Sequence, residues 1–376
     1  MKRAVSIVIP NWNGLKLLQQ FLPSVFAAAN RYCAAGAPVE ILVVDDASTD
    51  DSVSYLRERN FLALGSQDAG RAAENANESA VARRFLQNEE NRGFSATANA
   101  GVAAARHPLV FLINNDVELS EDCIAPLAGH FEDPSVFAVH CRVIDPRTGE
   151  ECGVGQMGGF ARGFLRVHQS WIPRPAAATN SLDDAGPERS AKLYSMFASG
   201  GSAMLDREKW LALGGFEPLL APAYWEDVEL SYRAWKRGFT VCYEPRSVVR
   251  HPVSSTMGRL DPRKIRRMRQ RNRLIAHWIH LQDAGFLASH VLWVSLLALL
   301  SPLSDRGDFL AALFSARKNL PAIRRRRYEE LAAAKRSDRE VLAIFEELRR
   351  RPDVLVFDNK SERARAEKQT SPDTRS

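Results

Sequence analysis

The first half of the chain alternates short apolar runs with longer amphipathic segments. The apolar runs are rich in β-branched residues and occupy positions 4–10, 39–45, 84–87 and 109–114. Runs of this length without polar alternation are typical of strands that are buried on both faces of a sheet. Between them, residues 15–29, 50–59 and 95–105 repeat apolar side chains at helical spacing. This alternation predicts a parallel, three-layer α/β/α sheet with right-handed crossovers.

Polar or acidic residues follow every predicted strand at its carboxyl end. These ends are residues 10–11, 45–46, 88–91 and 114–116. In open α/β sheets, ligands bind outside the carboxyl ends of the strands. We therefore expect a binding site at this edge of the sheet.

Two acidic strand ends have both a structural and a functional interpretation. Asp45 and Asp46 suit a turn that leads into a helix, but one carboxylate could also accept a hydrogen bond from a base or a ribose. Asn114, Asn115 and Asp116 suit an ordinary Asx turn. The alternative for these three is oxygen ligation of a hard divalent cation that also holds phosphate oxygens.

The segment YWEDVEL at 224–230 opens a predicted helix with three acids in five residues. One acid there is explained by the positive end of the helix dipole. Three acids beside a tyrosine and a tryptophan also resemble a sugar-binding wall that contains a general base. His251, taken alone, suits an ordinary loop histidine.

The second half of the chain predicts long loops and then helices. Residues 145–190 contain few regular runs, and long loops in compact domains are often binding loops. From about residue 262 the pattern is almost wholly helical. We expect a catalytic domain at 1–260, a basic helical region at 261–358 and a disordered tail at 359–376.

The helical region carries most of the positive charge of the chain. Residues 261–336 hold 16 Lys and Arg against 6 Asp and Glu, whereas the whole chain has a net charge of only +6. Within this region, residues 286–303 are strongly apolar over a stretch that is marginal for a membrane span. We expect contact of residues 262–327 with an anionic membrane surface, or packing on the catalytic domain or a partner. Nucleic acid is not expected, because the basic runs lack interleaved aromatic residues.

Other classes of protein are disfavoured by the sequence. The five cysteines are odd in number and form no CxxC pair, so neither a disulfide framework nor a zinc cluster is indicated. The apolar start ends at Pro10, before a signal peptide would be complete. We expect a cytoplasmic protein, peripheral at the inner face of the plasma membrane. The GxGxxG match at 153–158 lacks the strand and the helix that a dinucleotide fingerprint needs.

Seven segments occur in an order and spacing that resemble the family 2 glycosyltransferases. They are VSIVIPNWN, VVDDASTDDS, NRGFSATANAG, FLINNDVEL, SGGSAMLDREKWLALGGFEP, YWEDVELSYRAWKRGF and EPRSVVRH. The likeness is greatest to the rhamnosyltransferase-like branch that builds bacterial surface polysaccharide, and it extends from Val5 to about His280. The resemblance implies a GT-A fold, a nucleotide-sugar donor, a divalent metal (Mg²⁺ or Mn²⁺) and inversion at the anomeric carbon.

The resemblance also implies roles for individual positions. Asp227 matches the acid expected to be the base, with Glu226 as its partner and Trp225 as the acceptor wall. Metal binding is implied for Asp116, Asn114 and His251, and Asn114 stands where the family's DxD motif begins with an acid. Nucleotide-sugar binding is implied for Pro10, Asn11, Asn13, Asp45, Asp46, Gly93, Phe94, Asn99, Asn115, Asp116, Gly200 and Gly201.

The expected function is transfer of a sugar, with rhamnose as one candidate, from a nucleotide-diphosphate donor. The expected acceptor is a glycan or a lipid-linked glycan in bacterial cell-surface polysaccharide synthesis. Two alternatives differ in class. A processive synthase would need several membrane spans and a QxxRW-like segment, which the sequence lacks. A catalytically inactive scaffold that only binds nucleotide-sugar is the second, and Asn114 in place of an acid favours it slightly.

Overall fold

The computed structural model describes residues 3–64, 81–167, 169–174, 192–252 and 261–358. The tail at 359–376, for which we expect disorder, lies outside these residues. Most of residues 60–82 and the expected domain boundary at 260 lie outside them as well. The division into domains therefore stays a prediction.

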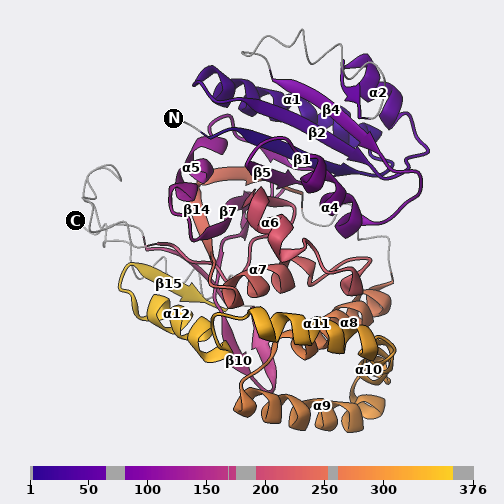
Figure 1. Cartoon of the computed structure of the whole chain (residues 1–376), viewed down its shortest axis with the longest axis vertical. Helices are drawn as coiled ribbons and strands as arrows, with labels where there is room; N and C mark the ends of the chain where they lie inside the picture. The colour runs from indigo at the N-terminus through magenta and orange to yellow at the C-terminus, as the bar shows by residue number, and fades with distance from the viewer. Residues whose placement is uncertain (1–2, 65–80, 168, 175–191, 253–260, 359–376) are drawn as a thin grey trace.

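A ten-stranded mixed sheet forms the centre of the molecule (Figure 1). Its strand order is β3-β4-β2-β1-β5-β13-β7-β14-β6, with β8 paired to β7. The strands are β1 (Val5–Asn11), β2 (Val39–Asp45), β3 (Leu62–Ala63), β4 (Ala82–Gln87), β5 (Leu109–Ile113), β6 (Glu118–Leu119), β7 (Val136–Ile144), β8 (Glu151–Gly153), β13 (Ser202–Asp206) and β14 (Thr240–Arg250).

The prediction of a parallel sheet is confirmed for the first half of the chain and wrong for part of the second. Strands β3, β4, β2, β1 and β5 are all parallel to one another. Strand β13 runs antiparallel to both β5 and β7, and β6 runs antiparallel to β14. The chain enters β13 beside the carboxyl end of β5, where Ser202 pairs with Ile113. The segment before β13 therefore reaches the edge where the site was expected.

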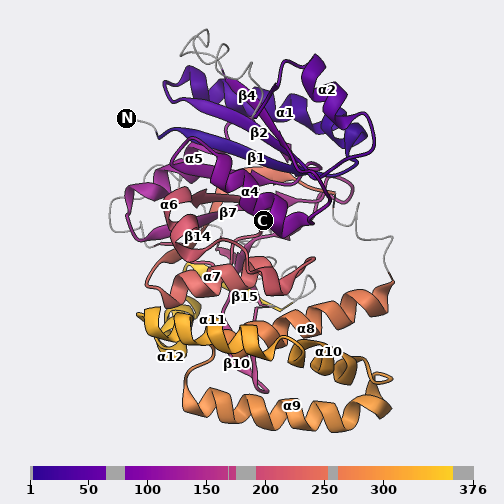
Figure 2. The ribbon, with the colours of Figure 1, turned by 45° about the vertical axis from the view of Figure 1, so that its right-hand side comes forward.

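Helices cover both faces of the sheet, as the three-layer prediction requires (Figures 1 and 2). One face packs against α1 (Leu15–Ala34), α2 (Ser52–Glu58) and α5 (Ile124–Gly129), and the other against α4 (Phe94–Ala104), α6 (Arg207–Leu213) and α7 (Glu226–Lys236). Along β1, Ile7 and Ile9 face the first core, whereas Val8 faces the second. Successive side chains thus alternate between two buried layers, which explains why positions 7–9 in the middle of β1 are all apolar.

The region after residue 261 is helical, as predicted. It contains α8 (Pro262–His280), α9 (Ala284–Ser304), α10 (Asp308–Arg317), α11 (Leu320–Ala333) and α12 (Asp338–Arg350). A separate small core around Leu274, Ile275, Ile279 and Phe309 joins α8 to α10. The chain then returns through β15 (Val354–Phe357), which pairs with β12 (Ser170–Pro173), and β12 pairs with β9 (Gly155–Gln156). The remaining short strands β10 (Gly159–Ala161) and β11 (Phe164–Arg166) form a hairpin.

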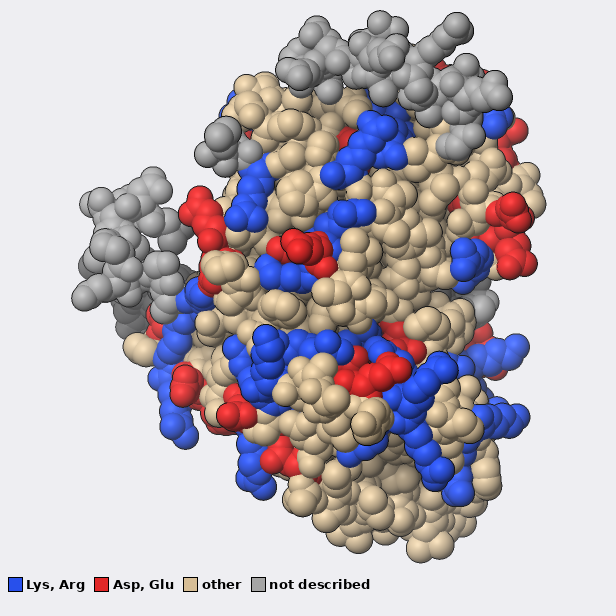
Figure 3. All heavy atoms as spheres, in the orientation of Figure 1, with Lys and Arg blue, Asp and Glu red and all other residues tan. Residues whose placement is uncertain are grey.

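Lys and Arg side chains gather across the face formed by the C-terminal helices (Figure 3). Several of them belong to internal ion pairs. Arg263 and Arg267 of α8 bind Asp308 of α10 at 2.9 and 2.7 Å. Arg326 of α11 binds Glu217 at 2.8 Å. Part of the basic run in the sequence therefore holds this region together.

Asp338 at the start of α12 anchors the returning chain to α7. The buried Asp338 carboxylate accepts hydrogen bonds from Tyr232 and Lys236 and from the backbone N–H groups of Gln282 and Asp283. Burial disfavours the charge, but these donors outweigh it, so the pKa of Asp338 lies below its usual range. A single carboxylate thus connects α7, the α8–α9 connection and α12.

We expect Asp338→Asn to destabilise the protein by about 3–5 kcal/mol, because it leaves the buried Lys236 ammonium without a charged partner. Urea unfolding followed by circular dichroism measures the loss. The matched control is Asp122→Asn, which breaks the exposed Arg31–Asp122 pair and should have little effect. Equal losses in the two variants would contradict the anchoring role of Asp338.

Candidate active site

Polar side chains at the carboxyl ends of β5, β1 and β2 form a continuous row. Asn115 donates its amide N–H to Asn11 Oδ1 at 2.8 Å, and Asn11 donates to Asp45 Oδ1 at 3.1 Å. The three strands are parallel and in register, so their ends meet at one edge. Pro10 is buried in β1 directly before Asn11. The residues expected at this edge from the sequence are therefore brought together here.

The Asp45 carboxylate is fully buried and organises the turn after β2. It accepts hydrogen bonds from Ser48 through the backbone N–H at 2.9 Å and the hydroxyl at 2.5 Å. Ser48 Oγ accepts the N–H of Asn13, whose side-chain oxygen accepts the N–H of Thr49 at 2.7 Å. A nucleotide contact to Asp45 would share the carboxylate with these bonds. Ser48 was not among the site residues expected from the sequence.

Asp46 holds the loop that leads into α4. Its carboxylate accepts the side-chain N–H of Asn88 and the backbone N–H groups of Arg92 and Gly93 at 2.8–2.9 Å. Gly93 has φ +79°, a left-handed conformation that favours glycine. Asp46 therefore fixes the conformation of the loop that lies beside the expected nucleotide.

Phe94 and Asn99 connect α4 to the segment that follows α6. The Phe94 ring lies 6.0 Å from the ring of Phe216. Asn99 both donates to the Phe216 carbonyl at 3.0 Å and accepts the Phe216 N–H at 2.8 Å. Both groups of the Asn99 amide are therefore paired with the backbone of this segment.

Asp116 and His251 meet at the same edge from different strands. His251 follows β14, which runs parallel to β7, so its carboxyl end faces the edge where β5 ends. His251 Nε2 lies 2.9 Å from Asp116 Oδ1. Asp116 is almost fully buried, whereas about a quarter of the His251 side chain is exposed. The pair is separated by 135 residues in the chain, and the sequence alone placed them together only through the resemblance.

The glycines before β13 connect the end of β5 to α7. A Cβ atom on Gly201 would lie within 2.8 Å of the amide atoms of Asn114, so only glycine leaves room for that side chain. The backbone N–H of the neighbouring Gly200 is close enough to the Asp227 carboxylate to favour its charged form. Asn114 thus lies beside the segment that contacts Asp227, and residues 114–116 form the link between Asp227 and the Asp116–His251 pair.

Glu226 and Asp227 form a pair of adjacent carboxyl groups at the start of α7. Burial and the neighbouring Asp227 raise the pKa of Glu226 to about 8. Glu226 Oε2 has no hydrogen-bond partner among the described residues. Burial also raises the pKa of Asp227, against the backbone N–H groups of Val228 and Gly200 that favour its charge. Near neutral pH, Glu226 therefore holds a proton.

Trp225 occupies a strained segment that α8 supports. Tyr224 and Trp225 have φ +74° and +73°, which is unusual for bulky residues. The buried Asn272 amide donates to the carbonyls of Leu220, Ala223 and Tyr224 at 2.6–2.9 Å. Asn272 is therefore a positioning residue for the acceptor wall formed by Trp225. This role of Asn272 was not expected from the sequence. A lone asparagine among the arginines of α8 was its only signal.

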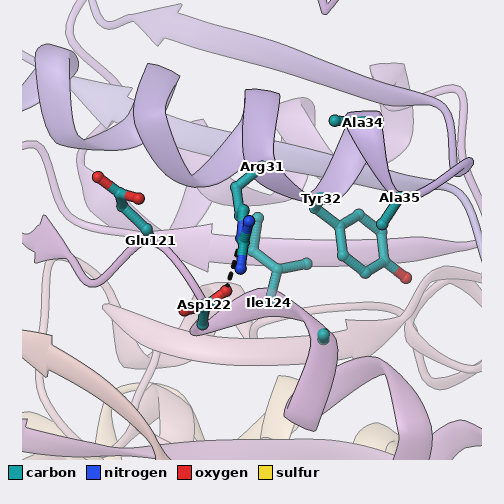
Figure 4. A pocket seen from close by; sticks show the side chains of 8 residues that line it. Arg31, Tyr32, Ala34, Ala35, Glu121, Asp122 and Ile124 are labelled. Atoms are coloured by element: carbon teal, nitrogen blue, oxygen red, sulfur yellow. Dashed lines mark hydrogen bonds and ion pairs between the residues drawn. The ribbon is translucent and has the colours of Figure 1, made fainter.

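A surface pocket lies away from this site (Figure 4). It is lined by residues of α1 and by the segment that leads into α5, with the Arg31–Asp122 ion pair at 2.9 Å across it. The end of α1 lies near the amino end of β2, because α1 connects β1 to β2. The pocket is therefore at the opposite edge of the sheet from Asp116 and Asp227.

The donor set at Asp116 fits a cation that is shared with a substrate. No group of three or more His, Cys, Asp and Glu side chains with metal-ligand geometry occurs within the described ranges. Asp116 and His251 offer one carboxylate and one imidazole, while the Asn114 amide lies against Gly201. Mg²⁺ is commonly held by one or two carboxylates together with substrate phosphates and water. These residues therefore suit such a shared ion better than a cage formed by protein alone.

Two family profiles match the chain. The profile described as "Glycosyl transferase family 2" matches residues 6–157, and "Glycosyl transferase family group 2" matches residues 109–317, which is more than half of the chain. Both cover the end of β5.

Curated relatives match over less than half of the chain. Polypeptide N-acetylgalactosaminyltransferase 11 of Xenopus tropicalis is 27% identical over 173 residues, which is 45% of this chain and 27% of the relative. The pre-mycofactocin glycosyltransferase of Mycobacterium tuberculosis is 27% identical over 168 residues, 44% of this chain and 31% of the relative. The matches thus span less than a third of each of these relatives.

Among solved structures, GalNAc-T7 with UDP, GalNAc and Mn²⁺ is similar with a TM-score of 0.52 at 18% identity, covering 85% of this chain and 58% of that one. This likeness supports the GT-A fold expected from the sequence. With the profile that covers more than half of its length, the chain belongs to family 2 of the glycosyltransferases.

Proposed function

We propose that this protein transfers a sugar from a nucleoside-diphosphate donor to an acceptor hydroxyl, with Asp227 as the general base. The observation that carries the proposal is the link between Asp227 and the end of β5. The backbone N–H of Gly200 favours the charge on Asp227, and the carbonyl of the adjacent Gly201 accepts the N–H of Asn114, two residues before Asp116. A donor whose diphosphate lies at Asp116 and His251 would therefore present its sugar toward Asp227.

The proposed reaction is a single displacement with inversion. The acceptor oxygen attacks the anomeric carbon while the bond from that carbon to the diphosphate oxygen breaks. Asp227 takes the acceptor proton, and the bonding electron pair leaves on the nucleoside diphosphate. Trp225 would form the wall against which the acceptor lies, since it directly precedes Glu226 and Asp227. Proton transfer to a positioned base of this kind contributes about 10²–10⁴-fold to the rate.

Asp116 and His251 would hold a divalent cation together with the diphosphate. Asn114 lies two residues before Asp116 in the chain. Mn²⁺ is present in the solved structure of GalNAc-T7, which supports a cation of this class. Such an ion stabilises the charge that builds on the leaving diphosphate. The chain's own contribution is to place the Asp116 carboxylate at the carboxyl end of β5.

The donor and the acceptor are proposed as chemical classes rather than as single compounds. The named relatives include N-acetylgalactosaminyltransferases, so the donor panel should contain UDP-GalNAc beside GDP-sugars and TDP-rhamnose. For the acceptor we propose a glycan or lipid-linked glycan of a bacterial surface polysaccharide. We further propose that the protein acts in the cytoplasm.

We expect donor turnover by the wild-type protein with Mn²⁺ or Mg²⁺, measured as release of nucleoside diphosphate across this panel. Asp227→Asn should lower the rate about 10²–10⁴-fold and leave binding of the nucleoside diphosphate intact. Glu347→Gln, an exposed change on α12, is the control. Near-normal turnover by Asp227→Asn would contradict the base assignment. Binding of donors with no turnover of any would favour the inactive scaffold.

The proton on Glu226 also predicts how stability depends on pH. The pKa of Glu226 is about 8 in the folded protein and near 4.5 in the unfolded chain, so the stability that its proton contributes at low pH is lost as the pH rises toward 8. Glu226→Gln removes this loss. We expect the melting temperature to fall less between pH 5 and pH 8 in Glu226→Gln than in Glu347→Gln. An identical fall in both variants would show that Glu226 ionises normally.

A further inference from the structure

We propose that α9 docks this protein on the surface of an anionic lipid bilayer, with the exposed side of the helix in the membrane interface. This inference goes beyond sugar transfer and identifies a surface that the proposed active site does not use. The surface is the α9 face, defined by Val291, Leu292, Leu296, Leu299, Leu300 and Leu303.

The α9 face is apolar and largely open to solvent. Leu299 is 75% exposed and Leu303 is 89% exposed, and the other four members are 39–66% exposed. Their spacing of one, three or four residues places them on one side of the helix. The space-filling view shows the corresponding end of the molecule almost free of charged side chains (Figure 3). A continuous apolar face of this kind marks an interaction site rather than ordinary surface.

The opposite side of α9 is fixed to the protein. His290 donates through Nδ1 to the carbonyl of Gly163 at 2.7 Å and accepts the indole N–H of Trp278 at 3.1 Å. Trp293 and Leu297 pack on the small core of the C-terminal helices. The helix is long and apolar enough to cross a membrane, but a span would have to release these contacts. An orientation parallel to the bilayer surface keeps them.

Basic side chains surround the α9 face. Arg162 lies at the tip of the β10–β11 hairpin, next to Gly163, which contacts α9. Arg306 follows α9, and Arg317 and Lys318 lie at the end of α10. All four are exposed, and no ion pair within the described part of the chain involves them. Phe314 of α10 adds an aromatic side chain that is 59% exposed.

The positive charge around the α9 face indicates which kind of partner covers it. A lipid surface with anionic headgroups would neutralise these four basic side chains while the α9 face enters the interface. A second copy of the chain would instead bring two such groups of positive charges together, which disfavours a dimer on this face. The observations therefore favour a bilayer over self-association.

Docking through α9 would place the acceptor wall near the membrane. The ring of His290 stacks on that of His277 of α8 at 5.2 Å, and His277 lies 5.7 Å from the ring of Trp225. Two ring contacts thus connect the docking helix to the wall. Resting on the proposed function, this connection indicates an acceptor whose lipid anchor stays in the membrane while its sugar reaches Asp227.

The test is co-sedimentation of the full chain with vesicles of phosphatidylcholine and phosphatidylglycerol in equal parts. We expect wild-type binding, and a loss of more than about tenfold in Leu299→Glu/Leu303→Glu, because each change removes apolar burial and adds a negative charge. Arg306→Gln and Arg317→Gln should each weaken binding about fivefold, a loss that vanishes on pure phosphatidylcholine. Leu211→Glu, an exposed leucine on α6, is the matched control and should bind as the wild type does.

Several outcomes would overturn the proposal. These are absence of wild-type binding, equal binding by the α9 variants, and retention on vesicles in alkaline carbonate, which indicates a span. A dimer that the α9 variants convert to monomer, without a change in vesicle binding, would assign the face to self-association. If the double variant fails to fold by circular dichroism, Leu303→Glu alone replaces it. Donor turnover without vesicles should be unchanged in Leu303→Glu, so failure of docking and failure of catalysis are read separately.

Discussion

The position of β5 between a parallel and an antiparallel neighbour is the constraint on which the site depends. Its pairing with β1 sets Asn115 against Asn11, and its pairing with β13 sets Asn114 against Gly201. Because β14 also ends at this edge, His251 reaches Asp116. A shift of one residue in the register of β5 would turn its buried side chains toward the other face of the sheet and displace the turn that holds Asp116. Fixed strand pairing therefore does what a flexible loop could not, since it holds acidic groups from distant segments in place.

The parts of this arrangement that follow from local sequence were predictable. The buried strands are continuous apolar runs, and the helices between them repeat apolar residues with a period of 3.6. Strands β1, β2, β4 and β5 lie where these patterns indicate. The antiparallel entry of β13 was not predictable, because it depends on pairing between segments about ninety residues apart. For the same reason the support of Trp225 by Asn272 has no local signal. The turn that uses both Asp45 oxygens is different, because Ser48 is only three residues from Asp45 and a turn was expected there. Long-range hydrogen bonds to the backbone leave little trace in composition.

The helical region after residue 261 is part of the same physical unit as the acceptor wall. Asn272 holds the strained segment before Trp225, and Asp338 connects α12 to α7. Many of the arginines that make this region basic are used in internal ion pairs, whereas those around α9 are not. Some basic side chains of this region thus form internal ion pairs, whereas others are open to a partner. The sequence shows the total positive charge but not which side chains belong to each group.

The central claim is that a diphosphate-bound cation lies at Asp116, on the same edge as Asp227. Anomalous scattering from crystals grown with Mn²⁺ and a nucleoside diphosphate tests it most directly. We predict a single anomalous peak beside the Asp116 carboxylate and His251, in contact with the diphosphate. This peak should be lost in Asp116→Asn. A nucleotide bound with its Mn²⁺ away from Asp116, or held at the Arg31–Asp122 pocket, would contradict it.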